Sequence, residues 1–293
     1  MIRRRNVSLG ETSRMIAAAQ ASWLTVRQGT APLLLCMPHT GTVIPAEIES
    51  RLVSPWLARK DTDWWIERLY EFAAGLSASV VRTGVSRTVI DCNRDPSGAS
   101  LYPGQATTEL CPTTTFDGEL LYRTGAAPQA AEIAARRREY FEPYHHAIEA
   151  EIARLCSVHP HVVLYDCHSI RSAVPRLFTD TLPHFNIGTF AGASCSPELT
   201  AGIEQLCDRA PFSRVTNGRF QGGYTTRYYG RPQHGVHAVQ MELACRGYLR
   251  EPQGEVDEGN WPCPWNDAVA APMRAVLQQV LTACLAFAAT ARA

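Results

Sequence analysis

Two histidines follow short aliphatic runs and could share one metal ion. His39 comes after "PLLLCM" and His168 ends the run "HVVLYDCH", so each is expected where a buried strand ends. In an open α/β sheet, this end of the strands faces the crevice that binds ligands. Two imidazoles and one carboxylate around an open position form the ligand set of hydrolytic zinc sites. A lone histidine at such a place is more often a hydrogen-bonded core residue, but two of them favour a metal site.

The third metal ligand is expected from the segment "KDTDWWIERLY", which starts at residue 60. This segment offers three carboxylates, Asp61, Asp63 and Glu67. In a helix, Asp63 and Glu67 would lie one turn apart. We favour Asp63, so the predicted metal ligands are His39, Asp63 and His168.

A single carboxylate interrupts another apolar run, "VHAVQMELAC". Glu242 is predicted to lie inside this strand, where a carboxylate is costly to bury unless a cation or a partner compensates it. One explanation is a catalytic base beside a metal ion. The other is a buried salt bridge to an arginine.

Arginines occur in two segments with unusual neighbours. "SRTVIDCNRDPSG" brings Arg87, Asn93 and Arg94 together at the expected end of a strand, and "GGYTTRYYGRPQHG" places Arg227 among glycines and tyrosines. Arginine is suited to bidentate binding of a carboxylate. Arginines at loop tips are more often solvated charges, but these surroundings favour a binding role.

The elements that must position these residues alternate between strands and helices. This alternation predicts an α/β fold, a three-layer α/β/α sandwich with a mixed, mostly parallel sheet. The irregular stretch 96–117 is rich in Pro, Gly, Ser and Thr, and so long a loop is expected to form a lid or a pocket wall. Strands are expected near 32–39, 79–81, 161–169, 184–190 and 237–244, and helices over 13–24, 45–52, 62–76, 127–156 (broken or bent near Pro143), 196–210 (capped by Ser196) and 266–291 (capped by Asn266).

Length and composition indicate one globular domain that acts on a small molecule. We expect a single domain over residues 1–293, with no assigned role for residues 1–30. The chain has 28 basic and 28 acidic residues without long runs of one sign, which argues against nucleic-acid or membrane partners. Its ten cysteines form no C-x-x-C pair and are expected to be reduced core thiols, so we expect a cytoplasmic protein. The sequence does not indicate an oligomeric state.

Seven segments follow one another along the chain in this order: "PHTG", "DTDWWIERLY", "SRTVIDCNRDPSG", "CPTTTFDGELLYR", "DCHSIRSAVPRLF", "NIGTFAGASC" and "GGYTTRYYGRPQHGVHAVQMEL". Together they resemble the N-formylglutamate amidohydrolase family, the deformylases of bacterial histidine degradation. The resemblance covers about residues 32–285. It implies a fold similar to that of zinc carboxypeptidases and aspartoacylase-like deacylases, and hydrolysis of N-formyl-L-glutamate to formate and L-glutamate.

The resemblance also implies roles for individual residues. The related enzymes hold one divalent metal, for which zinc is the first expectation here, by two histidines and a carboxylate. They bind the substrate carboxylate with an Asn-Arg pair and use a glutamate base. The carboxypeptidases take their metal carboxylate from a glutamate three residues after the first histidine, whereas this chain has Thr42 there. Asp63 matches the acidic position of the deformylase pattern, with Asp61 as the alternative. The other matching residues are His39, His168, Asn93, Arg94 and Glu242.

A substrate with two carboxylates requires two fixed cations. Arg94 and Arg227 are the expected pair, with Arg87 in reserve. Two alternatives remain at this point: a related deacylase of another N-acyl amino acid, and an inactive carboxylate-binding protein of the same fold. Glu242 argues against the inactive binding protein, because a pure binding protein has no need of a carboxylate buried in that strand.

Overall fold

A seven-stranded sheet forms the centre of the molecule. The computed structural model describes residues 23–290. The strands lie in the order β1-β3-β2-β4-β7-β5-β6. Strands β3, β2, β4 and β7 run parallel to one another, β1 and β5 are antiparallel to their neighbours β3 and β7, and β6 is parallel to β5. The strands are β1 (Leu24–Arg27), β2 (Leu33–Met37), β3 (Ser79–Thr83), β4 (Val162–Ile170), β5 (Phe185–Gly188), β6 (Arg214–Thr216) and β7 (Val236–Ala244).

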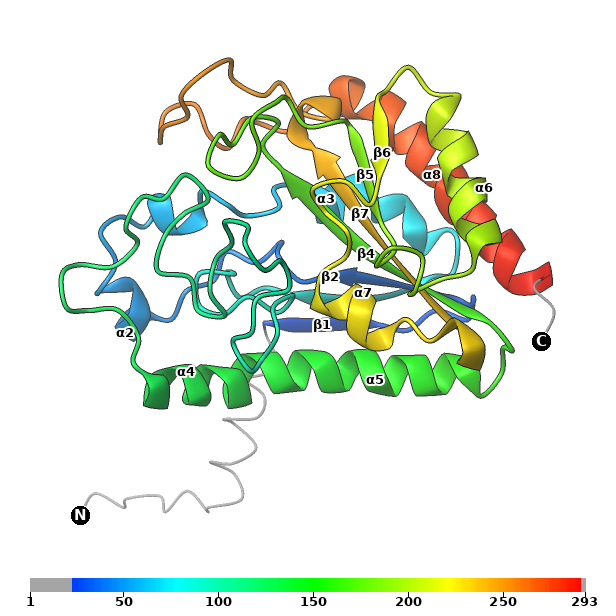
Figure 1. Cartoon of the computed structure of the whole chain (residues 1–293), viewed down its shortest axis with the longest axis horizontal. Helices are drawn as coiled ribbons and strands as arrows, with labels where there is room; N and C mark the ends of the chain where they lie inside the picture. Colours follow the sequence, from blue (N-terminus) through cyan, green and yellow to red (C-terminus); the bar gives the residue numbers. More distant parts are fainter. Residues whose placement is uncertain (1–22, 291–293) are drawn as a thin grey trace, which may run out of the picture.

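Helices cover both faces of the sheet, which makes three layers. Strands β2, β4 and β7 are buried along their whole length, and their side chains alternate between two apolar cores. Leu33 and Leu35 belong to the core with α3, α6 and α8, whereas Leu34 and Cys36 belong to the core with α5. Figure 1 shows α5 along one face and α6 with α8 on the other. The predicted α/β/α sandwich with a mixed, mostly parallel sheet is therefore confirmed.

The helices vary widely in length. Helix α6 begins after Ser196, whose hydroxyl accepts the backbone N–H of Glu198, and α8 begins after Asn266, whose side chain accepts the N–H of Val269. Both predicted caps are thus present. The helices are α2 (Ala46–Glu49), α3 (Ile66–Leu69), α4 (Ala130–Arg136), α5 (Glu142–Cys156), α6 (Pro197–Asp208), α7 (Tyr224–Tyr229) and α8 (Asp267–Thr290). Single-turn helices lie at Leu57–Arg59 (η1), Glu71–Ala74 (η2), Pro232–His234 (η4) and Cys245–Gly247 (η5).

The helix expected over 127–156 contains a π-helical turn in place of a break. The turn η3 spans Arg137–Phe141 and joins α4 to α5 just before Pro143. Proline lacks a backbone N–H and its ring clashes with the carbonyl of the preceding turn. A wider π turn accommodates both defects and keeps the helix continuous.

Other predicted elements differ in extent. The single helix expected over 62–76 begins only at Ile66, because Trp65 before it has a φ of 65°, and it is divided at Tyr70 into α3 and η2. The loop that carries Arg87 and Arg94 follows β3 without continuing the strand. Strands β1 and β6 and helix α7 were not predicted; they are short. Of the helix expected over 13–24, residues 13–22 lie outside the described part of the chain.

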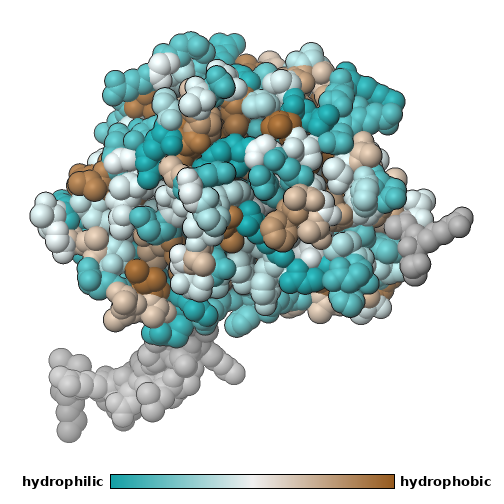
Figure 2. Space-filling model, in the orientation of Figure 1, coloured by the Kyte–Doolittle hydropathy of each residue, from teal (hydrophilic) through white to brown (hydrophobic). Residues whose placement is uncertain are grey.

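One helix is long and apolar enough to cross a membrane by length and composition alone, namely α8. In this structure its buried residues, such as Met273 and Leu277, pack into the core beside the sheet. On the face of the molecule shown in Figure 2, apolar residues are interspersed among hydrophilic ones. All ten cysteines are free and nine are buried, as expected for core thiols.

Candidate active site

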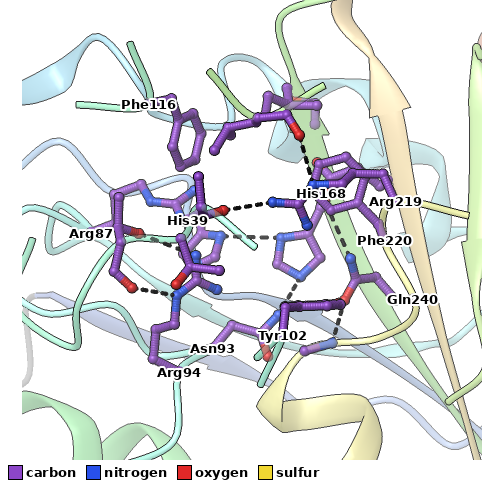
Figure 3. A pocket seen from close by; sticks show the side chains of 18 residues that line it. His39, Arg87, Asn93, Arg94, Tyr102, Phe116, His168, Arg219, Phe220 and Gln240 are labelled. Atoms are coloured by element: carbon purple, nitrogen blue, oxygen red, sulfur yellow. Dashed lines mark hydrogen bonds between the residues drawn. The ribbon is translucent and has the colours of Figure 1, made fainter. Parts of the chain in front are cut away.

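The C-terminal edge of the parallel strands collects the residues predicted to do chemistry. His39 lies two residues beyond the end of β2, while His168 in β4 is in register with Glu242 in the neighbouring strand β7. All three line one cavity that is partly open to solvent. Figure 3 shows His39 and His168 at the centre of this cavity, with Arg87 and Arg94 on one side and Arg219 on the other in this view.

His39, Asp63 and His168 form a tight group that could hold a metal ion. The Nδ1 atoms of the two histidines are 3.1 Å apart, and His168 Nδ1 is 3.1 Å from Asp63 Oδ2. The same carboxylate oxygen is 3.7 Å from His39 Nδ1. All three side chains are almost completely buried. The three predicted ligands are thus brought together, with one donor atom of each facing the same point.

The outer nitrogen of each histidine faces a second carboxylate. His39 Nε2 is 2.7 Å from Asp91 Oδ1, and His168 Nε2 is 2.9 Å from Asp166 Oδ2. Such a contact places the proton on Nε2 and leaves the Nδ1 lone pair for a metal. Burial alone would lower the pKa of His168, but Asp166 and Asp63 outweigh it and raise this pKa well above its ordinary value. Burial alone would raise the pKa of Asp91. The charges of His39, Arg94 and Arg87 outweigh this effect and hold the pKa well below its ordinary value.

The structure distinguishes among the three carboxylates considered as third ligand. The backbone N–H of Asp63 donates to the carbonyl of His39, which fixes Asp63 beside this histidine. Asp61 instead accepts the N–H of Phe116 at 2.6 Å, and burial raises its pKa to about 6. Neither Asp61 nor Glu67 belongs to the metal-ligand group.

The chemistry of this donor set fits a divalent metal ion. Within the described residues, Asp63 Oδ1 is buried without a hydrogen-bond partner. Arg87 Nη1 lies 3.6 Å from this oxygen and compensates the buried charge only in part, so a further cation at Oδ2 would stabilise the carboxylate. Two imidazole nitrogens and a carboxylate oxygen suit zinc and other first-row divalent metals.

A second histidine pair shows why proximity alone does not make a metal site. At the opposite edge of the sheet, His161 Nδ1 is 3.1 Å from His237 Nε2. The backbone N–H of Ser196 donates to His237 Nδ1, so the proton of neutral His237 lies on Nε2, which then faces His161 as a donor. Among the described residues, no carboxylate or thiol completes a three-residue group with this pair.

Glu242 projects from β7 into the cavity and is only 7% exposed. Its carboxylate accepts a hydrogen bond from Gln240 Nε2 at 3.2 Å. Within the described residues, no ion pair to an arginine is found for it, so the buried salt bridge considered from the sequence is not formed. Burial raises the pKa of Glu242 to about 7; the charge of Asp63 contributes, and His168 opposes the shift.

Arg87 and Asn93 line the cavity, but other residues already engage their side chains. Arg87 Nη2 is 2.7 Å from Asp91 Oδ2 and its Nη1 is 3.6 Å from Asp63 Oδ1. The Asn93 amide nitrogen is 3.1 Å from Asp166 Oδ2 and 2.9 Å from His168 Nε2, and its oxygen accepts the N–H of Thr225. With the proton of His168 on Nε2, the Asn93 amide donates to Asp166 Oδ2 and so holds the carboxylate that faces His168.

Arg94 and Arg227 differ in their position relative to the cavity. Arg94 lines it and donates from Nε and Nη2 to the backbone and side chain of Thr108. Arg227 is not among the lining residues. Its Nη1 donates to the carbonyl of Leu101, and its guanidinium lies 4.8 Å from the ring of Tyr102. The structure thus does not place Arg227 beside Arg94 in the cavity wall, as the sequence analysis expected. Arg227 instead holds the loop that contains Leu101.

Three residues at the site were not assigned a role from the sequence. Asp166 lies two residues before His168 in the same strand, so the two-residue period of a strand could have placed both side chains on one face. Asp91 lies in the segment "SRTVIDCNRDPSG", in which only Arg87, Asn93 and Arg94 were considered. Arg219 lies in the irregular segment 217–223, and its sequence neighbours carried no signal that it lines the cavity.

The contact between Asp166 and His168 yields a testable prediction. Asp166→Asn is expected to weaken metal affinity about 10- to 100-fold, because His168 loses the carboxylate that orients its ring. Titration against a chromophoric chelator measures this affinity. Asp61→Asn is the matched control, since Asp61 is buried but lies outside the group. Equal affinities for both variants and the unchanged protein would show that Asp166 does not orient the ligand.

Comparison with known protein families gives a match over most of the chain. The model of the N-formylglutamate amidohydrolase family matches residues 31–249. An N-formylglutamate deformylase of Pseudomonas aeruginosa is 45% identical over 265 residues, covering 90% of this chain and 96% of that protein. One from Pseudomonas putida is 43% identical over 267 residues, covering 91% and 97%.

Solved structures share the same fold. The crystal structure of N-formylglutamate amidohydrolase from Ralstonia eutropha matches with a TM-score of 0.73 and 20% identity, covering 90% of this chain and 97% of that one. A protein from Agrobacterium tumefaciens matches with a TM-score of 0.70 and 17% identity, covering 94% and 98%. At these identities the likeness concerns the fold.

Proposed function

Because the chain belongs to the N-formylglutamate amidohydrolase family, we propose that it hydrolyses N-formyl-L-glutamate to formate and L-glutamate. The observation that carries this proposal is the cavity in which the His39, Asp63 and His168 group lies beside the buried carboxylate of Glu242. A site of this kind suits the hydrolysis of an amide bond. The names of the two Pseudomonas relatives support formylglutamate as the substrate, and histidine degradation is the context that the sequence resemblance implies.

The proposed cofactor is one divalent metal ion, with zinc preferred, held by His39 Nδ1, Asp63 Oδ2 and His168 Nδ1. When bound, such an ion would activate a water molecule and polarise the formyl oxygen. Asp91 and Asp166 keep the two imidazoles in the tautomer that binding requires.

Glu242 is the proposed general base. Its carboxylate accepts a proton as water attacks the formyl carbon, and it then returns this proton to the nitrogen of the departing glutamate. Its pKa of about 7 suits both steps, because the group is then neither too weak a base nor too weak an acid.

The arginines of the cavity bind and orient the substrate in this proposal. Arg94 is assigned to the α-carboxylate, since it lines the cavity and its Nη1 has no hydrogen-bond acceptor among the described residues. Arg87 lies between Asp91 and Asp63, beside the metal ligands, where its charge stabilises the oxygen that becomes negative during attack. Asn93 acts through His168.

A formate-release assay tests the function. Protein stripped with a chelator and then reloaded with zinc, cobalt, manganese or iron is incubated with N-formyl-L-glutamate, and formate and glutamate are both quantified. Equal amounts of the two products from reloaded protein, and neither from stripped protein, are expected. Parallel assays with N-acetylglutamate and N-formylaspartate test for a related deacylase, and binding without turnover would indicate an inactive binding protein.

The raised pKa of Glu242 predicts the pH dependence of activity. A general base must be ionised, so kcat/KM is expected to fall tenfold per pH unit below the pKa of this group. Burial places that pKa at about 7, against an ordinary value of 4.5, and a bound cation shifts it back downward. The midpoint of the acid limb should therefore lie between these values when metal is kept saturating. If the residual activity of a Glu242→Gln variant showed the same fall of kcat/KM at low pH, another group would be responsible for that fall.

We also propose that the protein works in a reducing compartment such as the cytoplasm. Ten free cysteines, nine of them buried, support this, because thiols persist where disulfides are reduced.

A further inference from the structure

Arg219 carries a positive charge in the cavity wall and forms no ion pair with a carboxylate among the described residues. It lies in the segment between β6 and α7 and is partly buried. Its Nε donates to the carbonyl of Leu177 at 2.9 Å and its Nη2 to that of Ala106 at 2.7 Å. Among the described residues, its Nη1 has no acceptor. Because both partners are neutral carbonyls, the charge remains available to an anionic ligand.

The other two arginines of the cavity already face carboxylates. Arg87 lies 2.7 Å from Asp91, and Arg94 Nε lies 3.8 Å from the same residue. Burial lowers the pKa of Arg219, and the charge of Glu242, which lines the same cavity, opposes this shift only in part. A carboxylate on a ligand would remove this cost.

Aromatic rings hold the guanidinium of Arg219 in place before a ligand arrives. Its Cζ lies 5.3 Å from the ring centre of Phe220 and 5.4 Å from that of Tyr102. The Tyr102 hydroxyl in turn donates to the carbonyl of Gly222 at 2.9 Å. A cation fixed by such contacts loses little entropy when it binds a ligand.

Arg94 and Arg219 are arranged alike. Each donates from Nη2 to the loop 96–117, Arg94 to Thr108 and Arg219 to Ala106. Each also uses Nε for a backbone carbonyl and leaves Nη1 without an acceptor among the described residues. In Figure 3 they lie on opposite sides of the two histidines. A ligand with a carboxylate at each end could contact both while its middle lies at the metal ligands.

We propose that Arg219 binds the side-chain carboxylate of the substrate and so selects an acidic over a neutral N-acyl amino acid. This inference rests on the proposed function, in which Arg94 takes the α-carboxylate. Arg227, which the sequence suggested for this role, contacts the Tyr102 ring and the Leu101 carbonyl outside the lining of the cavity.

The test compares N-formyl-L-glutamate with N-formyl-L-glutamine, which has nearly the same shape but a neutral side chain. Arg219→Met is expected to lower kcat/KM for formylglutamate about 30-fold or more, because truncating one partner of a desolvated charge pair has an effect of this size. The loss for formylglutamine should be within about threefold. Arg227→Met is the matched control. It should lower kcat/KM for both substrates by the same factor, because it loosens the loop but removes no contact with the substrate carboxylate.

Equal losses on the two substrates in Arg219→Met, or a loss selective for formylglutamate in Arg227→Met, would overturn the assignment. Arg219→Gln can still donate to one carbonyl and replaces the methionine variant if that one does not fold. Calorimetric binding of both compounds to the unmodified protein and to each variant gives a second readout. If the unmodified protein released no formate, the proposed function would fail, while these binding data would still decide whether Arg219 reads the carboxylate.

Discussion

His168→Ala is expected to purify without stoichiometric metal and to release no measurable formate from N-formylglutamate. His168 would supply one of only three protein ligands, so its loss should weaken metal affinity by more than the about 100-fold that removal of an outer hydrogen-bond partner costs. His39→Ala should behave in the same way. Elemental analysis after gel filtration measures the metal content, and circular dichroism tests the fold. We expect the fold to persist, because both histidines lie at strand ends and face the cavity.

The two carboxylates that the sequence left open provide the internal comparison. Asp63→Ala is expected to weaken metal binding about tenfold or more, whereas Asp61→Ala should leave it near normal. Asp61 is a stringent control, because it is also largely buried and lies only two residues away. Full metal content in His168→Ala, or loss in Asp61→Ala but not in Asp63→Ala, would refute the ligand assignment.

The sheet and its functional edge were predictable because the central strands are buried on both faces. Such strands appear in a sequence as short aliphatic runs, and a polar residue at the end of a run stands out. His39 and His168 stood out in this way, and Glu242 did so inside its own run. Parallel neighbours then bring these strand ends to the same edge of the sheet, as β2, β4 and β7 do.

The choice between Asp61 and Asp63 depended on backbone geometry that the sequence does not specify. A helix through this segment would have placed Asp63 and Glu67 together. Instead, Trp65 adopts a positive φ and the N–H of Asp63 bonds to the carbonyl of His39. Local propensity gives no warning of such a turn, because tertiary contacts stabilise it.

Arg219 and Arg227 show the same limit for irregular segments. Both lie near glycines, and no periodicity indicates which of them faces the cavity. The difference arises from a long-range contact, because Tyr102, far away in the sequence, contacts both guanidiniums. Side-chain type predicted that an arginine would bind a carboxylate, but only the folded chain shows which arginine is available.

Glu242→Gln is expected to retain its metal and its fold while kcat falls by about 10² to 10⁴, the usual contribution of a positioned acid-base group. The amide has nearly the same shape and can still accept the hydrogen bond from Gln240. It cannot accept a proton from water. Since no arginine pairs with Glu242 within the described residues, the substitution leaves no buried charge without its partner. Steady-state kinetics, metal analysis and thermal unfolding measure the three properties.

Binding measurements separate a catalytic role of Glu242 from a structural one. If the carboxylate acts only as base and acid, the variant should bind N-formylglutamate with an affinity within about threefold of the unmodified protein, and the loss should lie in kcat rather than KM. Glu242→Asp offers a second comparison, because it keeps the charge but withdraws it from the substrate by one methylene. Near-normal turnover in Glu242→Gln would exclude this residue as the base. A loss of affinity equal to the loss of kcat/KM would instead indicate that Glu242 shapes the cavity, leaving the proton transfer to another group.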